Sequence, residues 1–196
     1  MLGHALHESQ AFGFRLKYAN KNNLKEWRNI LGTDDFESTI KGIMSRRTSP
    51  NGVFGIKVHH YHLKAFGSFS SLLHLLPDPY FVFISRQDVV SQAVSMAIAE
   101  QTGNWITGQV TNPKLPVYNF DQINFAMRRI IKQNAAWKYT LAGNGCRYLE
   151  VSFEKLRLDT RSAIQEIADF MQVELDPKSI PDSPITKRQS KELNEQ

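Results

Sequence analysis

The chain has 196 residues, 41% of them hydrophobic and 22% charged, a length and balance that predict one soluble globular domain over 1–196. A single cysteine, Cys146, excludes an internal disulfide framework and is typical of a reducing compartment such as the cytoplasm. The net charge is +5, but the basic residues are spread along the chain, which argues against a nucleic-acid-binding arm and for a compact anionic ligand. No apolar run approaches the ~20 residues of a membrane span.

The first half of the chain predicts three short helices, over 2–10, 23–31 and 34–47. Thr33 precedes the third helix and is the predicted N-cap, because threonine side chains accept backbone N–H groups at helix starts. The run over 53–58 (VFGIKV) predicts the first strand. A polar and aromatic helical stretch follows to about Leu76.

The second half predicts two further strands, over 80–85 and 146–153, and three helices, over 88–101, 121–141 and from Asp159 or Thr160 to Met171. The run YFVFIS at 80–85 is nearly continuously apolar, as expected of a strand buried on both faces. Three strands that alternate with helices predict an α/β domain with a parallel sheet. Ligands bind such sheets outside the carboxyl ends of the strands, so we expect the chemistry there.

Basic and hydroxyl side chains follow the strand at 80–85. Arg86 comes directly after it, Asp88 lies near the start of the next helix, and Ser95 lies about two turns further on. A guanidinium presents paired N–H donors that match a phosphate, and a serine hydroxyl can add another hydrogen bond. The pattern predicts a phosphate site.

This R-x-D-x-V-x-x-A-V-S pattern over 86–95 resembles the segment that sulfotransferases use for the 3′-phosphate of 3′-phosphoadenosine 5′-phosphosulfate. The continuation AEQTGNWIT over 99–107 resembles the prokaryotic trehalose sulfotransferase-like family. Other segments resemble that family in order and spacing, so that the likeness covers nearly the whole chain: 51–58, 116–137, 148–156 and 187–195.

The resemblance implies a P-loop-nucleotide-hydrolase-like three-layer fold and a sulfotransferase. Such an enzyme transfers a sulfuryl group from 3′-phosphoadenosine 5′-phosphosulfate to a hydroxyl of a carbohydrate such as trehalose, without a metal. The residues expected to bind the donor are Lys57, Arg86, Ser95, Arg188 and Gln189. Those expected to line the acceptor site are Gln101, Thr102 and Trp105.

The chain departs from the family pattern in two ways. The family begins with a strand and an R-S-G-S-T-type loop whose N–H groups cradle the phosphosulfate. Met1 aligns inside or after the helix that follows, so we expect the strand and loop to be missing, and the C-terminus to be shortened as well. Lys17 stands where relatives have a glutamate that is the proposed base, and an ammonium cannot accept a proton unless its pKa falls greatly.

These departures leave a second function open, a catalytically inactive remnant that binds a nucleotide or a protein partner. An RNA-binding module would need aromatic residues interleaved with base-reading motifs, and a nucleotide kinase would need a Walker lysine. His59, His60 and His62 suggest a metal, but the sequence offers no third ligand on one face. We therefore expect a cytoplasmic protein, a monomer or a homo-oligomer, that acts on small molecules and not on nucleic acid.

Overall fold

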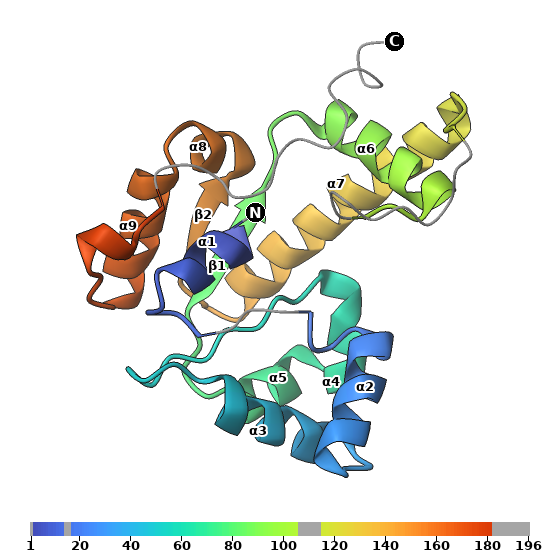
Figure 1. The fold of residues 1–196 in the computed structure, drawn as a ribbon. Helices are drawn as coiled ribbons and strands as arrows, with labels where there is room; N and C mark the ends of the chain where they lie inside the picture. The colour runs from blue at the N-terminus through green and yellow to red at the C-terminus, as the bar shows by residue number, and fades with distance from the viewer. Residues whose placement is uncertain (1, 14–16, 106–114, 182–196) are drawn as a thin grey trace.

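A parallel sheet of two strands lies at the centre of the computed structural model, which describes residues 2–13, 17–105 and 115–181 (Figure 1). The strands are β1 (Phe81–Ser85) and β2 (Tyr148–Ser152). Their last residues are register partners, so both strands end at the same edge of the sheet. We call this edge, and the residues that directly follow it, the carboxyl edge.

Two long helices connect β1 to β2, namely α6 (Val89–Thr102) and α7 (Phe120–Gly143). The carboxylate of Asp88 caps α6 by accepting a backbone N–H of its first turn at 2.9 Å. Ala93 of α6 and Ala126 of α7 are buried where the helices pack, and their small side chains let the two helices approach closely. Figure 1 shows the pair extending away from the sheet.

The largest apolar cluster joins β2 to three helices, α1 (Leu2–Glu8), α8 (Phe153–Leu158) and α9 (Thr160–Met171). Asp159 caps α9, since its carboxylate accepts a first-turn N–H at 2.9 Å, which settles the choice between Asp159 and Thr160. A short 3₁₀ helix, η2 (Pro177–Ser179), follows. The buried members of the cluster are Ala5, Leu6, Phe12, Val151, Leu156, Ala163, Ile164, Ile167, Ala168 and Ile180.

The rest of the amino-terminal half is helical and packs around separate aromatic clusters. Its elements are α2 (Lys21–Leu31), α3 (Phe36–Arg47), the 3₁₀ helix η1 (His60–His62), α4 (Leu63–Phe66) and α5 (Phe69–Leu75). Tyr18 is fully buried, stacks on Phe54 with ring centroids 6.0 Å apart, and meets the edge of Trp27. Burial raises the pKa of Tyr18 to about 12, so the phenol is neutral.

Two predictions about this half are wrong. The N-cap of α3 is Asp35 and not Thr33, because the Asp35 carboxylate accepts a first-turn N–H at 2.8 Å. The run over 53–58 is not a strand, and within it only Ile56 forms a bridge. A strand needs a neighbour along its whole length to pair its N–H and C=O groups, and the described residues provide none.

The central sheet is also more open than the apolar run at 80–85 predicts. In β1 only Phe83 is buried, whereas Ile84 is 39% exposed. A strand with one described neighbour keeps an open edge and is not covered on both faces. The α/β class with a parallel sheet is confirmed, whereas the single-domain organisation stays a prediction. No helix within the described ranges is long and apolar enough to cross a membrane.

Candidate functional site

Arg86 lies at the carboxyl edge, as the sequence predicts. Its side chain is 20% exposed, and its guanidinium carbon lies 4.9 Å from the ring centroid of Phe153. The Arg86 Nε atom is buried and makes no hydrogen bond with a described residue, although it lies 3.9 Å from Oε1 of Glu154. At that distance the two groups form an ion pair, but they are too far apart for a hydrogen bond.

The partners of Arg86 come from the start of α8. Ser152 caps this helix by accepting the N–H of Lys155 at 3.1 Å, so the predicted strand over 146–153 ends here and Phe153 opens the helix. Glu154 follows in the first turn, where the helix dipole favours a carboxylate. Its Oε2 atom accepts the backbone N–H of Gln87 at 3.2 Å.

Ser95 lies on α6 and is partly buried. Within the described ranges no hydrogen bond or ion pair joins Ser95 to Arg86. The two residues belong to consecutive elements, β1 with its following turn and α6, so the order that the motif requires is present. Their joint contact with a phosphate stays a prediction.

The three predicted acceptor residues lie at the end of α6. The Gln101 amide donates to the carbonyl of Val117 at 3.0 Å and accepts its N–H at 2.8 Å, which ties the segment before α7 to α6. Thr102 is buried, and its hydroxyl donates to the Ile98 carbonyl at 2.9 Å. Trp105 is 55% exposed. Gln101 and Thr102 therefore have structural hydrogen bonds, and acceptor binding by the three residues stays a prediction.

A second group of titratable side chains includes Lys57, and we call it the basic cluster: Lys17, Lys57, His59 and His62. Burial and then the charge of Lys17 lower the pKa of Lys57, although the residue as a whole is exposed. Burial, followed by the charges of Lys57, Lys17 and His62, lowers the pKa of His59 to about 3. Burial and the two lysines also lower the pKa of His62. Of the described residues, the charged groups that act on these three are all basic.

The histidines near Lys57 are held by contacts within η1 and with α7. The Nδ1 atom of His62 accepts the backbone N–H of His59 at 3.2 Å, which leaves its hydrogen on Nε2. That Nε2 atom is buried without a partner among the described residues. The ring of His60 instead packs against the edge of Trp137 on α7, 5.4 Å between centroids. Among the described residues no three His, Cys, Asp or Glu side chains are grouped as metal ligands.

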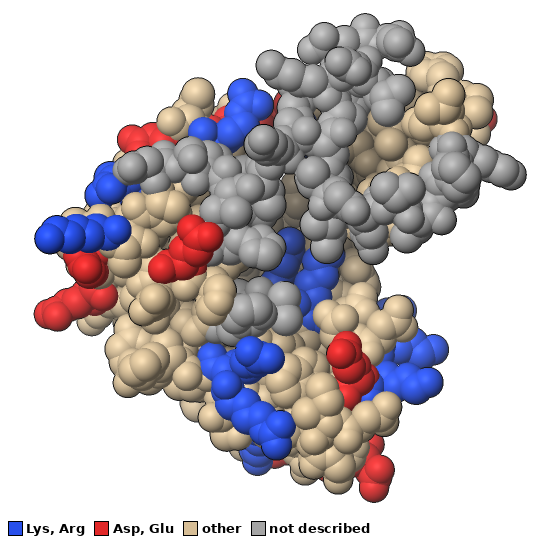
Figure 2. Space-filling model, in the orientation of Figure 1, with Lys and Arg blue, Asp and Glu red and all other residues tan. Residues whose placement is uncertain are grey.

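Figure 2 shows how the charges lie on one face of the molecule. Basic side chains occupy a recess in the middle of this face, and others spread over the helices below it. Acidic side chains are scattered over this face, and some of them lie near the recess. On this face the described basic residues form no continuous stripe, which agrees with a compact anionic ligand better than with an extended polyanion.

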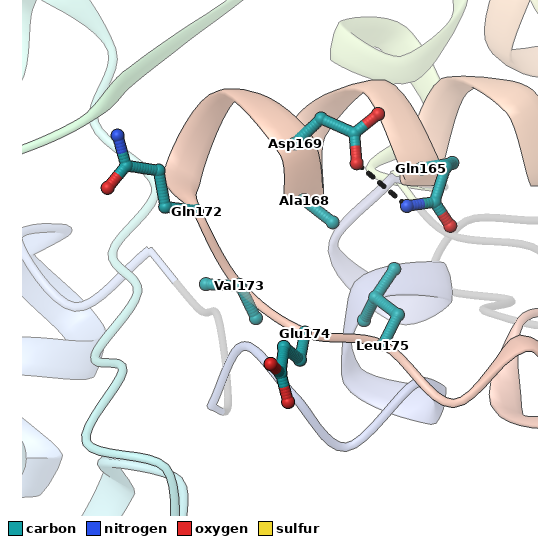
Figure 3. A pocket seen from close by; sticks show the side chains of 7 residues that line it. All are labelled: Gln165, Ala168, Asp169, Gln172, Val173, Glu174 and Leu175. Atoms are coloured by element: carbon teal, nitrogen blue, oxygen red, sulfur yellow. Dashed lines mark hydrogen bonds between the residues drawn. The ribbon is translucent and has the colours of Figure 1, made fainter.

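One hollow among the described residues lies elsewhere and does not fit an anion. It measures about 410 Å³ and is lined by the end of α9 and the following segment: Gln165, Ala168, Asp169, Gln172, Val173, Glu174 and Leu175 (Figure 3). Its charged residues are two carboxylates, which repel a polyanion. A second hollow, which shares Gln172, is lined by Tyr80 and Arg147, just before the two strands. Both hollows lie away from the carboxyl edge.

The sequence did not predict that Glu154 would lie at the carboxyl edge or that Lys17 would lie near the histidines. Two predicted donor-binding residues cannot be placed. Arg188 and Gln189 lie outside the described residues. Glu154 follows a strand that the sequence reveals, so an acidic residue directly after a second strand end was the available signal. Lys17 and Lys57 carried no such signal, because they are far apart in the chain.

Comparisons with known proteins identify the family of the chain. A family model described as Stf0 sulphotransferase matches residues 32–196. A curated relative, "Trehalose 2-sulfotransferase" of Mycobacterium tuberculosis (strain ATCC 35801 / TMC 107 / Erdman), is 30% identical over 122 residues. That match covers 61% of this chain and 44% of the relative, so it spans less than half of the relative's length. Since the family model covers most of the chain, the protein belongs to the Stf0 sulphotransferase family.

Proposed function

We propose that the chain binds 3′-phosphoadenosine 5′-phosphosulfate and transfers its sulfuryl group to a hydroxyl of a carbohydrate such as trehalose. The observation that carries this proposal is Arg86 at the carboxyl edge, held by Glu154 and Phe153. The terminal nitrogens of Arg86 make no hydrogen bond to a described residue, so the fork that binds a phosphate is available. Membership of a sulfotransferase family supports the same reaction.

In this proposal the two basic regions bind different parts of the donor. Arg86 and Ser95 hold the 3′-phosphate, and Arg188 and Gln189 close over the nucleotide. Lys57 contacts the donor near its sulfuryl end, where the basic cluster supplies positive charge. The domain adopts the P-loop-nucleotide-hydrolase-like three-layer arrangement that the family implies.

The work of the protein is positioning and charge stabilisation. The acceptor oxygen forms the new bond to sulfur while the bond from sulfur to the bridging phosphate oxygen breaks, so that 3′,5′-diphosphoadenosine leaves and the proton of the acceptor hydroxyl passes to solvent. Little covalent chemistry falls to side chains in such a transfer, so orientation and electrostatic preorganisation dominate the rate. Gln101, Thr102 and Trp105 shape the acceptor site, and Lys57 stabilises the negative charge that gathers on the leaving group.

Lys17 favours a second candidate, a protein that binds the nucleotide without transferring sulfate. The family's glutamate base is replaced here by a residue that raises the positive charge of the basic cluster. Loss of a general base typically lowers a rate by 10²- to 10⁴-fold. Binding of the nucleotide is common to both candidates, and only an activity measurement separates them.

The test is calorimetric titration with 3′,5′-diphosphoadenosine and with AMP. We expect the diphosphate to bind about 10- to 150-fold more tightly, which is the effect of one charge-assisted interaction of roughly 1.5–3 kcal/mol. Arg86→Ala should remove the preference. Equal affinities of the unaltered chain for the two nucleotides would contradict the 3′-phosphate assignment.

A further inference from the structure

Glu154 and Arg86 meet because of the register of the sheet. Ser85 pairs with Ser152 at the ends of the two parallel strands, so Arg86 and Phe153 are the residues that directly follow neighbouring strands. Glu154 follows one residue later, in the first turn of α8. A cation and a carboxylate from distant parts of the chain are thereby brought to one point of the carboxyl edge.

The carboxylate of Glu154 acts on both the side chain and the main chain of the β1 end. Its Oε1 atom lies 3.9 Å from Nε of Arg86, and its Oε2 atom accepts the N–H of Gln87 at 3.2 Å. The second contact fixes the backbone directly after Arg86. The ring of Phe153 lies 4.9 Å from the guanidinium carbon of Arg86, so it also limits the movement of the Arg86 side chain. A long side chain with many rotamers is thus confined.

These contacts use one edge of the guanidinium. Glu154 faces Nε, whereas the two terminal nitrogens make no hydrogen bond to a described residue. An arginine binds a phosphate oxygen pair through parallel N–H groups, so the remaining edge suffices for a bidentate contact. Glu154 carries a negative charge that offsets the charge of Arg86. Any contribution of Glu154 to anion binding must therefore come from orienting Arg86 and not from added attraction.

We propose that Glu154 is a positioning residue, which holds Arg86 by its Nε edge so that the terminal nitrogens meet the 3′-phosphate of the nucleotide. The identity of this phosphate rests on the proposed function. The proposal requires that Glu154 influence binding only through Arg86, and only for nucleotides that carry a 3′-phosphate. A carboxylate that merely stabilised the start of α8 would show neither restriction.

The test is a double-mutant cycle on the full chain, with dissociation constants for 3′,5′-diphosphoadenosine and AMP measured by calorimetry. Glu154→Ala should weaken binding of the diphosphate about three- to tenfold and that of AMP less than about twofold, since pairs in direct contact couple by such amounts. In the Arg86→Ala background Glu154→Ala should have no further effect. Glu166→Ala is the matched control, because this half-exposed carboxylate pairs with Lys155 of α8 at 2.6 Å.

Glu154→Gln keeps an oxygen that can accept the Gln87 N–H but removes the charge, so we expect an intermediate loss of about two- to threefold. This variant also replaces Glu154→Ala if the latter does not fold. Tighter diphosphate binding by either variant would overturn the proposal, because the carboxylate would then compete with the phosphate. Equal weakening of both nucleotides would overturn it in favour of a structural role. If Arg86→Ala itself left the preference intact, the proposed function would fail first, and with it this inference.

Discussion

The carboxyl edge and the basic cluster both contain basic side chains, but they are built in opposite ways. At the carboxyl edge one cation, Arg86, faces a carboxylate and an aromatic ring. In the basic cluster, Lys17, Lys57 and two histidines lie close enough that each lowers the pKa of its neighbours or is lowered by them. The first region is suited to orienting a phosphate, and the second supplies concentrated charge.

The two regions also differ in their effect on stability without a ligand. An Arg–Glu pair at a helix start is nearly neutral in charge. Burial, followed by the like charges of Lys57, Lys17 and His62, lowers the pKa of His59 to about 3, so His59 is neutral at pH 7 while the charges of the cluster still repel one another. A bound oxyanion would offset this repulsion, so ligand binding should stabilise the basic cluster more than the carboxyl edge.

Lys17→Glu should produce the largest effect, because it changes the sign of one member of the basic cluster. If the family's base position is retained in space, a carboxylate there should raise sulfate transfer by about 10²- to 10⁴-fold. The measurement is transfer to a panel of sugars, trehalose included. Lys17→Gln is the control that removes the cation without adding a base, and equal rates for the two variants would contradict a base role at this position.

Arg86→Lys should weaken binding of 3′,5′-diphosphoadenosine nearly as much as Arg86→Ala, by about tenfold or more. Lysine keeps the positive charge but loses the planar fork of donors. The exposed Arg128 of α7 provides the control, since Arg128→Lys should leave the affinity unchanged. Full affinity in Arg86→Lys would show that the carboxyl edge acts by charge alone, and the contrast between the two regions would disappear.

His59→Asn should make stability less sensitive to acid. The pKa of His59 in the folded state is about 3, below its ordinary value of 6.5, so the unfolded chain binds more protons between these values. Folding stability from this group is complete above about pH 6.5 and is lost as the pH falls toward 3. Between pH 7.5 and pH 4.5 the free energy of unfolding of His59→Asn should fall by roughly 1 kcal/mol less than that of the unaltered chain, after allowance for solvent screening.

Denaturant unfolding at the two pH values measures this difference directly. His74→Asn is the control, because His74 is exposed on α5. An identical pH dependence of the unaltered chain and His59→Asn would mean that His59 titrates normally and that the basic cluster is more open to solvent than its contacts indicate.

The sequence predicted the carboxyl edge better than the basic cluster, and the reason is physical. An apolar run that ends in a polar residue marks the end of a strand, so Arg86 could be placed from its neighbours alone. Its pairing with Glu154 could not, because that contact depends on the register between β1 and β2. Lys17 and Lys57 approach one another through packing of the amino-terminal helices, which leaves no periodic signal.

Local structure was predicted where it depends on the chain itself. The helices α2, α6, α7 and α9 lie within a few residues of their predicted bounds, since amphipathic spacing and caps are local. The strand expected over 53–58 failed because a strand depends on a partner. The N-cap of α3 moved from Thr33 to Asp35, where a carboxylate reaches the first-turn N–H.

Phe153→Leu should give the smallest effect and isolate the aromatic side of the carboxyl edge. The ring lies 4.9 Å from the guanidinium carbon of Arg86, and a partly exposed cation–π contact is worth roughly 0.5–1 kcal/mol. We therefore expect 3′,5′-diphosphoadenosine to bind about two- to fivefold more weakly, with AMP unaffected. Phe153→Tyr keeps the ring and should bind normally, and Phe170→Leu removes a ring that packs on Tyr80 before β1, away from the site. Leucine fills the same position at the start of α8, so stability should change little. If Phe153→Leu and Phe153→Tyr weakened binding equally, the contact with Arg86 would not be the cause, and Glu154 alone would confine the guanidinium.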